Sequence, residues 1–177
     1  KLINKKNAGL GMARNTGIDY ASGTIILFID GDDYIADDMI ESLYNDMIEN
    51  EADTCVGGFT RSYENRMEPQ SNPIAPKLFI DKEIRHELLV RMIGKGEVDD
   101  YIEMSACRVL FSMEIIRKFN IRFKSERDFI SEDLIFGTDY YSHAKRVFLS
   151  TNIGYFYCFN EGSLTTRYRQ DRFEKQK

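Results

Sequence analysis

The chain has 177 residues, of which 42% are hydrophobic and 30% are charged, and its formal net charge is −5. This length suits one domain with a hydrophobic core, and this composition is typical of a globular protein rather than a disordered one. The negative net charge disfavours nucleic acid and anionic lipid as partners of the whole surface. An anionic ligand would therefore require a bound cation or a few well-placed basic residues.

The cysteines and the apolar stretches indicate a reducing compartment and no membrane span. Cys55, Cys107 and Cys158 are odd in number and widely spaced, which argues against a set of disulfides. No apolar run reaches the roughly 18 residues that a membrane-spanning helix requires, and the first residues do not resemble a signal peptide. The chain begins at Lys1 rather than at a methionine, so we expect a fragment or a processed product.

The first third of the chain alternates between helical and strand-like patterns. Residues 9–22 predict a helix, and the apolar run 24–29 predicts a central parallel strand that is buried on both faces. Residues 37–49 predict a second helix and residues 53–63 a second strand, which together indicate an α/β layer. The expected apolar stripe of the first helix is Leu10, Ala13, Gly17, Ile18 and Ala21. That of the second helix is Met39, Ile40, Leu43, Tyr44, Met47 and Ile48.

The remainder of the chain is less regular. Residues 64–78 contain all three prolines and predict a loop, and residues 81–94 predict a helix. A strand over 106–112 and a short helix over 113–119 are expected next. The last elements are a helix over 131–146 with Ser131 as its N-cap, strands over 146–150 and 153–160, and a charged helical tail over 167–177.

Three carboxylates follow the apolar run directly: Asp30, Asp32 and Asp33. In open α/β sheets, ligands bind at the carboxyl ends of the strands. Carboxylates crowded at such an end repel one another, and a hard divalent cation relieves this repulsion while recruiting phosphate oxygens. The alternative is an exposed loop whose aspartates only cap the next helix, a role that also suits Asp37 and Asp38.

Two further segments could take part in a site. Asn7 and Arg14 flank glycines at the start of the first helix, where backbone amides can approach an anion and an arginine can bind a phosphate. Glu132 and Asp133 begin the helix over 131–146. Acidic residues in a first helical turn are favoured by the helix dipole, so a purely structural role for this pair stays open.

Taken together, the segments NAGLGMARNTG, GTIILFIDGDDYIADDMIESLY, SEDLIFG and YFYCFNEGSLTT resemble the family 2 glycosyltransferases of GT-A fold in their order, spacing and residues. The resemblance extends from Asn7 to about Thr166 and is weakest between residues 60 and 105. It implies a Rossmann-like α/β fold with a mixed, mainly parallel sheet flanked by helices. It also implies a single domain over 1–177. Residues 1–105 would be the remainder of the half that binds metal and nucleotide sugar, and residues 106–177 would be the half that contains the acceptor site and the catalytic base.

The resemblance further implies an inverting enzyme that moves a sugar from a nucleotide-diphosphate donor to an acceptor hydroxyl with Mn²⁺ or Mg²⁺. The acceptor would be a glycan or a lipid-linked glycan in polysaccharide synthesis. No nucleic acid would be involved, and the protein would be cytoplasmic or peripheral at the cytoplasmic face of a membrane. By position, the implied roles are metal binding for Asp32 and Asp30, donor binding for Asn7, Arg14, Asp30 and Ser163, and general base for Asp133. Asp33 would support the metal site. Glu132, the second implied catalytic residue, would support Asp133 or contact the acceptor.

Two departures from the family pattern matter. The usual opening strand and loop that hold the nucleobase have no counterpart, so we expect several tens of residues to be missing before Lys1 and expect this fragment to have little activity alone. In the late motif, Cys158 and Asn160 stand where arginines often occur, so contacts to the diphosphate would come from elsewhere, with Arg167 or Arg169 as candidates. A nucleotidyltransferase of similar fold and a catalytically inactive sugar-nucleotide-binding module remain as alternatives.

Overall fold

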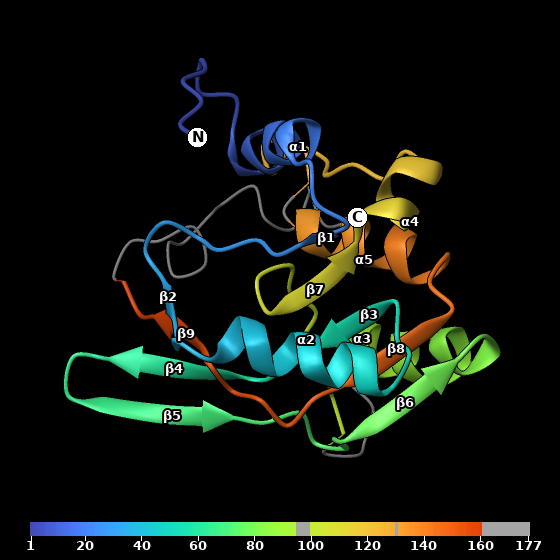
Figure 1. The fold of residues 1–177 in the computed structure, drawn as a ribbon. Helices are drawn as coiled ribbons and strands as arrows, with labels where there is room; N and C mark the ends of the chain where they lie inside the picture. Colours follow the sequence, from blue (N-terminus) through green and yellow to red (C-terminus); the bar gives the residue numbers. More distant parts are fainter. Residues whose placement is uncertain (95–99, 130, 161–177) are drawn as a thin grey trace.

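The computed structural model describes residues 1–94, 100–129 and 131–160, and Figure 1 shows two sheets with helices packed around them. The five-stranded sheet has the order β1 (Ile25–Ile26), β7 (Val109–Ser112), β3 (Thr54–Val56), β8 (Arg146–Leu149) and β6 (Lys77–Ile80). The four-stranded sheet has the order β2 (Tyr34–Ile35), β9 (Tyr155–Cys158), β4 (Phe59–Tyr63) and β5 (Arg66–Gln70). The helices are α1 (Leu10–Tyr20), α2 (Met39–Glu49), the π-helical turn η1 (Ile84–Leu88), α3 (Leu89–Ile93), α4 (Met113–Lys118) and α5 (Glu132–Tyr141).

The five-stranded sheet is covered by helices on both faces. Because side chains alternate along a strand, each strand contributes to two cores. Cys55, Leu110 and Phe148 pack with α2 on one face, and that helix crosses in front of β3 and β8 in Figure 1. Neighbouring strand residues, such as Val56 and Val109, pack with buried side chains of α1, α3, α4 and α5 on the other face. The predicted α/β class, with a mixed sheet between helices, is confirmed.

Antiparallel pairs outnumber parallel ones among the described strands, unlike the predicted mainly parallel sheet. Only β3 with β8 and β4 with β9 pair in parallel. The other pairings are antiparallel, including both neighbours of β7. Short connections account for part of this result, because the turn between β4 and β5 is too short for the crossover that parallel neighbours require.

The apolar run 24–29 is not the central strand that its composition predicts. Only Ile25–Ile26 is a strand, and within the described residues it pairs with β7 alone, at the edge of the sheet. The chain then leaves the sheet, and Phe28 enters the core, where its ring contacts the rings of Phe123 and Phe136. An unbroken apolar run was compatible with this arrangement because composition alone does not distinguish a strand from a buried extended segment.

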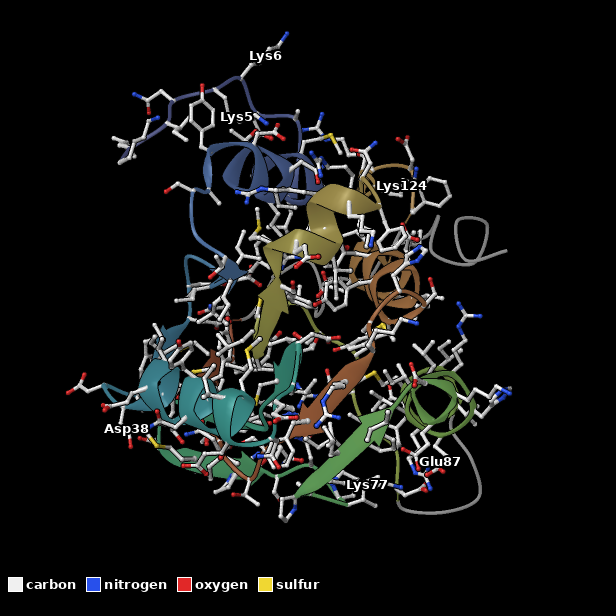
Figure 2. All side chains as sticks on the ribbon, turned by 45° about the vertical axis from the view of Figure 1, so that its right-hand side comes forward. Lys5, Lys6, Asp38, Lys77, Glu87 and Lys124 are labelled. Carbon is white, nitrogen blue, oxygen red and sulfur yellow. The ribbon has the colours of Figure 1, made fainter. Side chains whose placement is uncertain are left out.

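The expected proline-rich loop over 64–78 contains β5 and the start of β6, so this prediction was wrong. Pro69 lies within β5, opposite Thr60. A proline can occupy this position because β5 is an edge strand, where a residue without an N–H group breaks no ladder hydrogen bond on the open side. At the other end of the segment, Lys77 and Glu87 form an ion pair of 2.7 Å that joins β6 to η1 (Figure 2).

The helices begin close to their predicted positions, but the one predicted over 131–146 ends at Tyr141, and the buried faces differ from those predicted. On α2, Met39, Leu43 and Met47 are buried, whereas Ile40, Tyr44 and Ile48 are exposed. Of the stripe predicted for α1, only Ile18 is fully buried, and Gly11 and Arg14 take the other buried positions. The predicted cap of α5 is absent, since the Ser131 side chain accepts no capping hydrogen bond. The predicted tail helix over 167–177 lies outside the described residues.

No helix in the described part of the chain is both long enough and apolar enough to span a bilayer.

Candidate functional site

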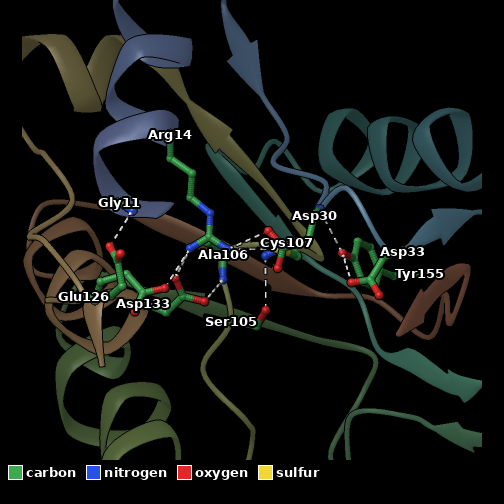
Figure 3. A network of polar contacts seen from close by, with 11 residues as sticks. Gly11, Arg14, Asp30, Asp33, Ser105, Ala106, Cys107, Glu126, Asp133 and Tyr155 are labelled. Carbon is green, nitrogen blue, oxygen red and sulfur yellow. Dashed lines mark hydrogen bonds and ion pairs between the residues drawn. The ribbon is translucent and has the colours of Figure 1, made fainter. Parts of the chain in front are cut away.

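Arg14 brings together the two acidic motifs that the sequence singled out. Its Nη2 donates to Asp30 Oδ1 at 2.9 Å, and its Nη1 donates to Asp133 Oδ1 at 2.5 Å and to Glu132 Oε1 at 3.1 Å (Figure 3). The Arg14 side chain is only 7% exposed. We call Asp30, Glu132 and Asp133 the carboxylate cluster. The fold therefore places the end of the apolar run beside the first turn of α5.

The acidic loop (residues 30–33) directs its three carboxylates to different partners. Its turn is closed by a hydrogen bond of 3.1 Å from Asp33 N to Asp30 O. The Asp33 carboxylate accepts hydrogen bonds from β9, whereas Asp30 binds Arg14. Asp32 is exposed, and its Oδ2 accepts from Asn160 Nδ2 at 3.1 Å. Asp32 is thus the carboxylate of this loop with the most access to solvent.

At the start of α5, Asp133 is held from two sides. Its Oδ1 accepts from Arg14, and its Oδ2 accepts from the backbone N–H of Ala106 at 3.2 Å. The side chain of Asp133 is 24% exposed to solvent, whereas that of Glu132 is 12% exposed. Of the two neighbouring acids, Asp133 is the more accessible to a molecule in solution.

Burial and nearby charges shift the pKa values of Glu132 and Arg14 for different reasons. Burial, together with the nearby charge of Asp133, raises the pKa of Glu132 to about 7. For Arg14, burial lowers the pKa, but the carboxylates of Asp133 and Asp30 outweigh it, so that the net shift is upward. Arg14 therefore stays charged at neutral pH.

The free energy of unfolding is expected to fall as the pH rises from 4.5, the ordinary pKa of glutamate, to about 7. In this range folded Glu132 keeps its proton, whereas Glu132 in the unfolded chain loses it. The tighter binding of this proton stabilises the folded state fully below pH 4.5, and this stabilisation is lost as the pH approaches 7. Urea denaturation of wild type and Glu132→Gln across this range measures it. The difference between the two proteins should change with pH, and a constant difference would contradict the shift.

Close packing of α1 against residues 122–127 sets the position of Arg14. The Asn15 side chain donates to Phe123 O and accepts from Phe123 N, both at 2.9 Å. Glu126 accepts from the Gly11 backbone at the start of the helix, at 3.2 Å. A side chain at Gly11 would collide with the carbonyl oxygen of Lys124, so glycine is required there.

The other two predicted donor residues lie elsewhere. Asn7 is not a partner of Arg14: its Oδ1 accepts from Gly9 N at 3.1 Å and from Arg127 Nη2 at 3.0 Å. It lines a pocket of about 470 Å³ together with Lys5, Lys6 and Arg127. Ser163 lies outside the residues that the structure describes.

Several contacts of the site had no signal in the sequence. Cys107 Sγ lies 3.4 Å from Arg14 Nη2, and burial raises the pKa of this thiol to about 12, so it is neutral. Tyr155 contacts the acidic loop from β9. Both residues lie within apolar segments, where a cysteine or a tyrosine is an ordinary core residue.

A divalent cation requires several oxygen ligands, and carboxylates are among those it prefers. Among the residues with described positions there is no group of three or more histidine, cysteine, aspartate or glutamate side chains that could hold a metal ion. Mg²⁺ bound with a nucleotide requires less, since one or two carboxylates and the substrate phosphates suffice. Exposed Asp32 and partly exposed Asp30 fit this smaller set.

Known proteins resemble the chain over most of its length. A family model described as glycosyl transferase family 2 matches residues 1–114. The uncharacterized glycosyltransferase EpsJ of Bacillus subtilis (strain 168) is 31% identical over 170 residues, which cover 93% of this chain and 46% of EpsJ. The poly(ribitol-phosphate) beta-N-acetylglucosaminyltransferase TarP of Staphylococcus aureus (strain N315) is 26% identical over 160 residues, covering 89% of this chain and 44% of TarP. The chain thus spans about half the length of these curated relatives.

The solved structure of S. aureus TarS 1–349 in complex with UDP-GlcNAc has the same fold. It matches 97% of this chain and 46% of the TarS chain with a TM-score of 0.72 at 19% sequence identity. The predicted GT-A-like fold is thereby confirmed.

Proposed function

Because the chain belongs to glycosyl transferase family 2, we propose that it transfers a sugar from a nucleotide-diphosphate donor to an acceptor hydroxyl, with inversion at the anomeric carbon. The observation that carries this proposal is the position of Arg14, whose contacts join Asp30 of the acidic loop to Asp133 of α5. The carboxylate proposed for the donor side, Asp30, and the one proposed for the acceptor side, Asp133, thus share one arginine. The complex of TarS with UDP-GlcNAc supports a nucleotide sugar as the donor class.

Asp32 and Asp30 would hold Mn²⁺ or Mg²⁺ on the donor side. When bound, the cation would stabilise the negative charge of the departing diphosphate. Asn7 and Ser163 are proposed to contact the donor. Arg14 acts indirectly in this proposal: its terminal nitrogens already donate to Asp30, Glu132, Asp133 and the Cys107 thiol, so it orients the carboxylates rather than the donor.

Asp133 is the proposed general base. The acceptor hydroxyl attacks the anomeric carbon, the bond to the diphosphate breaks, and Asp133 takes the hydroxyl proton. Arg14 and the Ala106 amide fix the direction of this carboxylate, and Glu132 supports it. One displacement inverts the anomeric centre and requires no enzyme nucleophile.

We further propose that residues 1–105 form the donor half and residues 106–177 the acceptor half of the domain. The acceptor would be a glycan or a lipid-linked glycan, and the name of the relative TarP supports a polymer as acceptor. The protein would act in the cytoplasm or at the cytoplasmic face of a membrane. Membership of a glycosyl transferase family favours this function over nucleotidyl transfer.

A screen of UDP-, GDP- and dTDP-sugars with Mn²⁺ or Mg²⁺ tests the proposal on a form of the protein extended before Lys1, assayed beside residues 1–177 alone. At least one donor should be hydrolysed or transferred in a cation-dependent manner. Asp32→Ala is expected to remove most of this activity, since it takes away the most accessible carboxylate of the acidic loop. Asp38→Ala, at the exposed start of α2, is the matched control and should behave as wild type. Equal activity of Asp32→Ala and wild type would contradict the metal-binding role.

A further inference from the structure

One tyrosine contacts both ends of the acidic loop. The Tyr155 hydroxyl donates to Asp33 Oδ2 at 2.5 Å, and its oxygen accepts from the backbone N–H of Asp30 at 3.3 Å. Figure 3 shows Tyr155 beside Asp30 and Asp33, on the side of the loop opposite Arg14. A tyrosine hydroxyl has one proton to donate and can also accept, so this group satisfies both contacts at once.

Asp33 is bound to the same strand through both of its carboxylate oxygens. Its second carboxylate oxygen, Oδ1, accepts from the backbone N–H of Cys158 at 2.8 Å. Both oxygens of Asp33 are therefore bound to β9, whereas Asp32 is exposed and Asp30 binds Arg14. Of the three carboxylates, Asp33 is the one placed to anchor the loop rather than to bind a ligand.

We propose that Tyr155 is a positioning residue of the donor site. Through Asp33 it holds the acidic loop in the shape that leaves Asp30 and Asp32 available to a divalent cation. The inference rests on the proposed function, because the cation enters with the nucleotide-diphosphate donor. Cys158 lies five residues before Ser163 in the sequence, so Asp33 also ties the acidic loop to the strand that leads toward the late donor motif.

A merely structural role is the alternative. Tyr155 is only 3% exposed and belongs to the core that packs around α2, and a buried tyrosine commonly finds a partner for its hydroxyl. Such a role predicts that loss of the hydroxyl changes stability alone. A positioning role predicts weaker binding of the cation by a protein that stays folded.

Tyr155→Phe separates these roles because it removes one oxygen and keeps the ring in the core. Tyr34→Phe is the matched control. Tyr34 is exposed, lies opposite Phe156 of β9, and stacks on the Phe156 ring. The experiment uses a form of the protein extended before Lys1. Calorimetry follows the titration of Mn²⁺ into this protein in the presence of UDP, and thermal unfolding is recorded without ligand. Tyr155→Phe is expected to weaken Mn²⁺ binding about 10- to 100-fold, as removal of groups that orient metal ligands does. Tyr34→Phe should bind as wild type does.

A variant with both Tyr155→Phe and Asp33→Asn shows whether Tyr155 affects Mn²⁺ binding through Asp33. If Tyr155 acts through Asp33, Tyr155→Phe and Asp33→Asn should weaken Mn²⁺ binding by similar factors, and the double variant should be little worse than either. Additive losses, or a far larger loss in Asp33→Asn, would make Asp33 a direct ligand and overturn the inference. Unchanged binding in a folded Tyr155→Phe protein would overturn it as well. If wild type itself bound no Mn²⁺ with UDP, the proposed function would fail together with the inference.

Discussion

Replacement of Asp133 with asparagine is expected to slow sugar transfer about 10²- to 10⁴-fold, the usual contribution of a positioned general base, and to leave donor binding unchanged. The amide keeps the size of the carboxylate but cannot take the proton of the acceptor hydroxyl. Donor binding should persist because the hydrogen bonds of Asp30 to Arg14 and of Asp32 to Asn160 do not involve Asp133. Initial rates of transfer and calorimetric binding of the donor measure the two properties separately.

Asp139→Asn is the matched control for this variant. It neutralises a more exposed aspartate of the same helix, whose partner is His143, and it should transfer sugar at the wild-type rate. Undiminished transfer by folded Asp133→Asn protein would contradict the role of general base. Lower stability with an unchanged rate per folded molecule would support the view that α5 is only a core helix.

Replacement of Arg14 with methionine is expected to lower the free energy of unfolding by about 3 kcal/mol, near the lower end for a broken buried ion pair. The reason is that Asp30, Glu132 and Asp133 would lose their shared cation while remaining close together. The value is not higher because these carboxylates keep part of their exposure to water. Urea denaturation followed by circular dichroism measures the change.

The pH dependence and a surface variant serve as controls. Protonation removes the repulsion among the unpaired carboxylates, so the deficit of Arg14→Met should shrink as the pH falls. Arg66→Met breaks an exposed ion pair with Glu68 and should cost no more than about 1 kcal/mol. If Arg14→Met cost no more than Arg66→Met at every pH, the guanidinium would not be the counter-ion of the cluster.

The sequence located the polar parts of the site better than it located their neighbours. Local sequence patterns were enough to identify the acidic loop, which follows an apolar run, and the Glu132–Asp133 pair, which begins a helical pattern. Arg14 was singled out on the assumption that it would bind an anionic ligand. That it would instead join carboxylates more than 100 residues apart in the chain is a property of tertiary packing, which periodicity does not encode.

The errors in the fold have a similar origin. On α2, the six apolar residues form one broad stripe in sequence, but only the side toward β3 is covered, so Ile40, Tyr44 and Ile48 are exposed. The prolines of 64–78 indicated a loop because an edge position cannot be recognised before the sheet order is known. In the sequence Tyr155 cannot be distinguished from the other apolar residues of its strand, and only the structure shows its contact with Asp33.

A crystal structure with Mn²⁺ and UDP tests the central claim most directly, namely that the acidic loop binds the cation that accompanies the donor. The anomalous signal of manganese should lie about 2.1 Å from a carboxylate oxygen of Asp32, close to Asp30 and in contact with the diphosphate. Manganese and diphosphate bound elsewhere, with Asp32 facing only solvent, would contradict the proposed donor site.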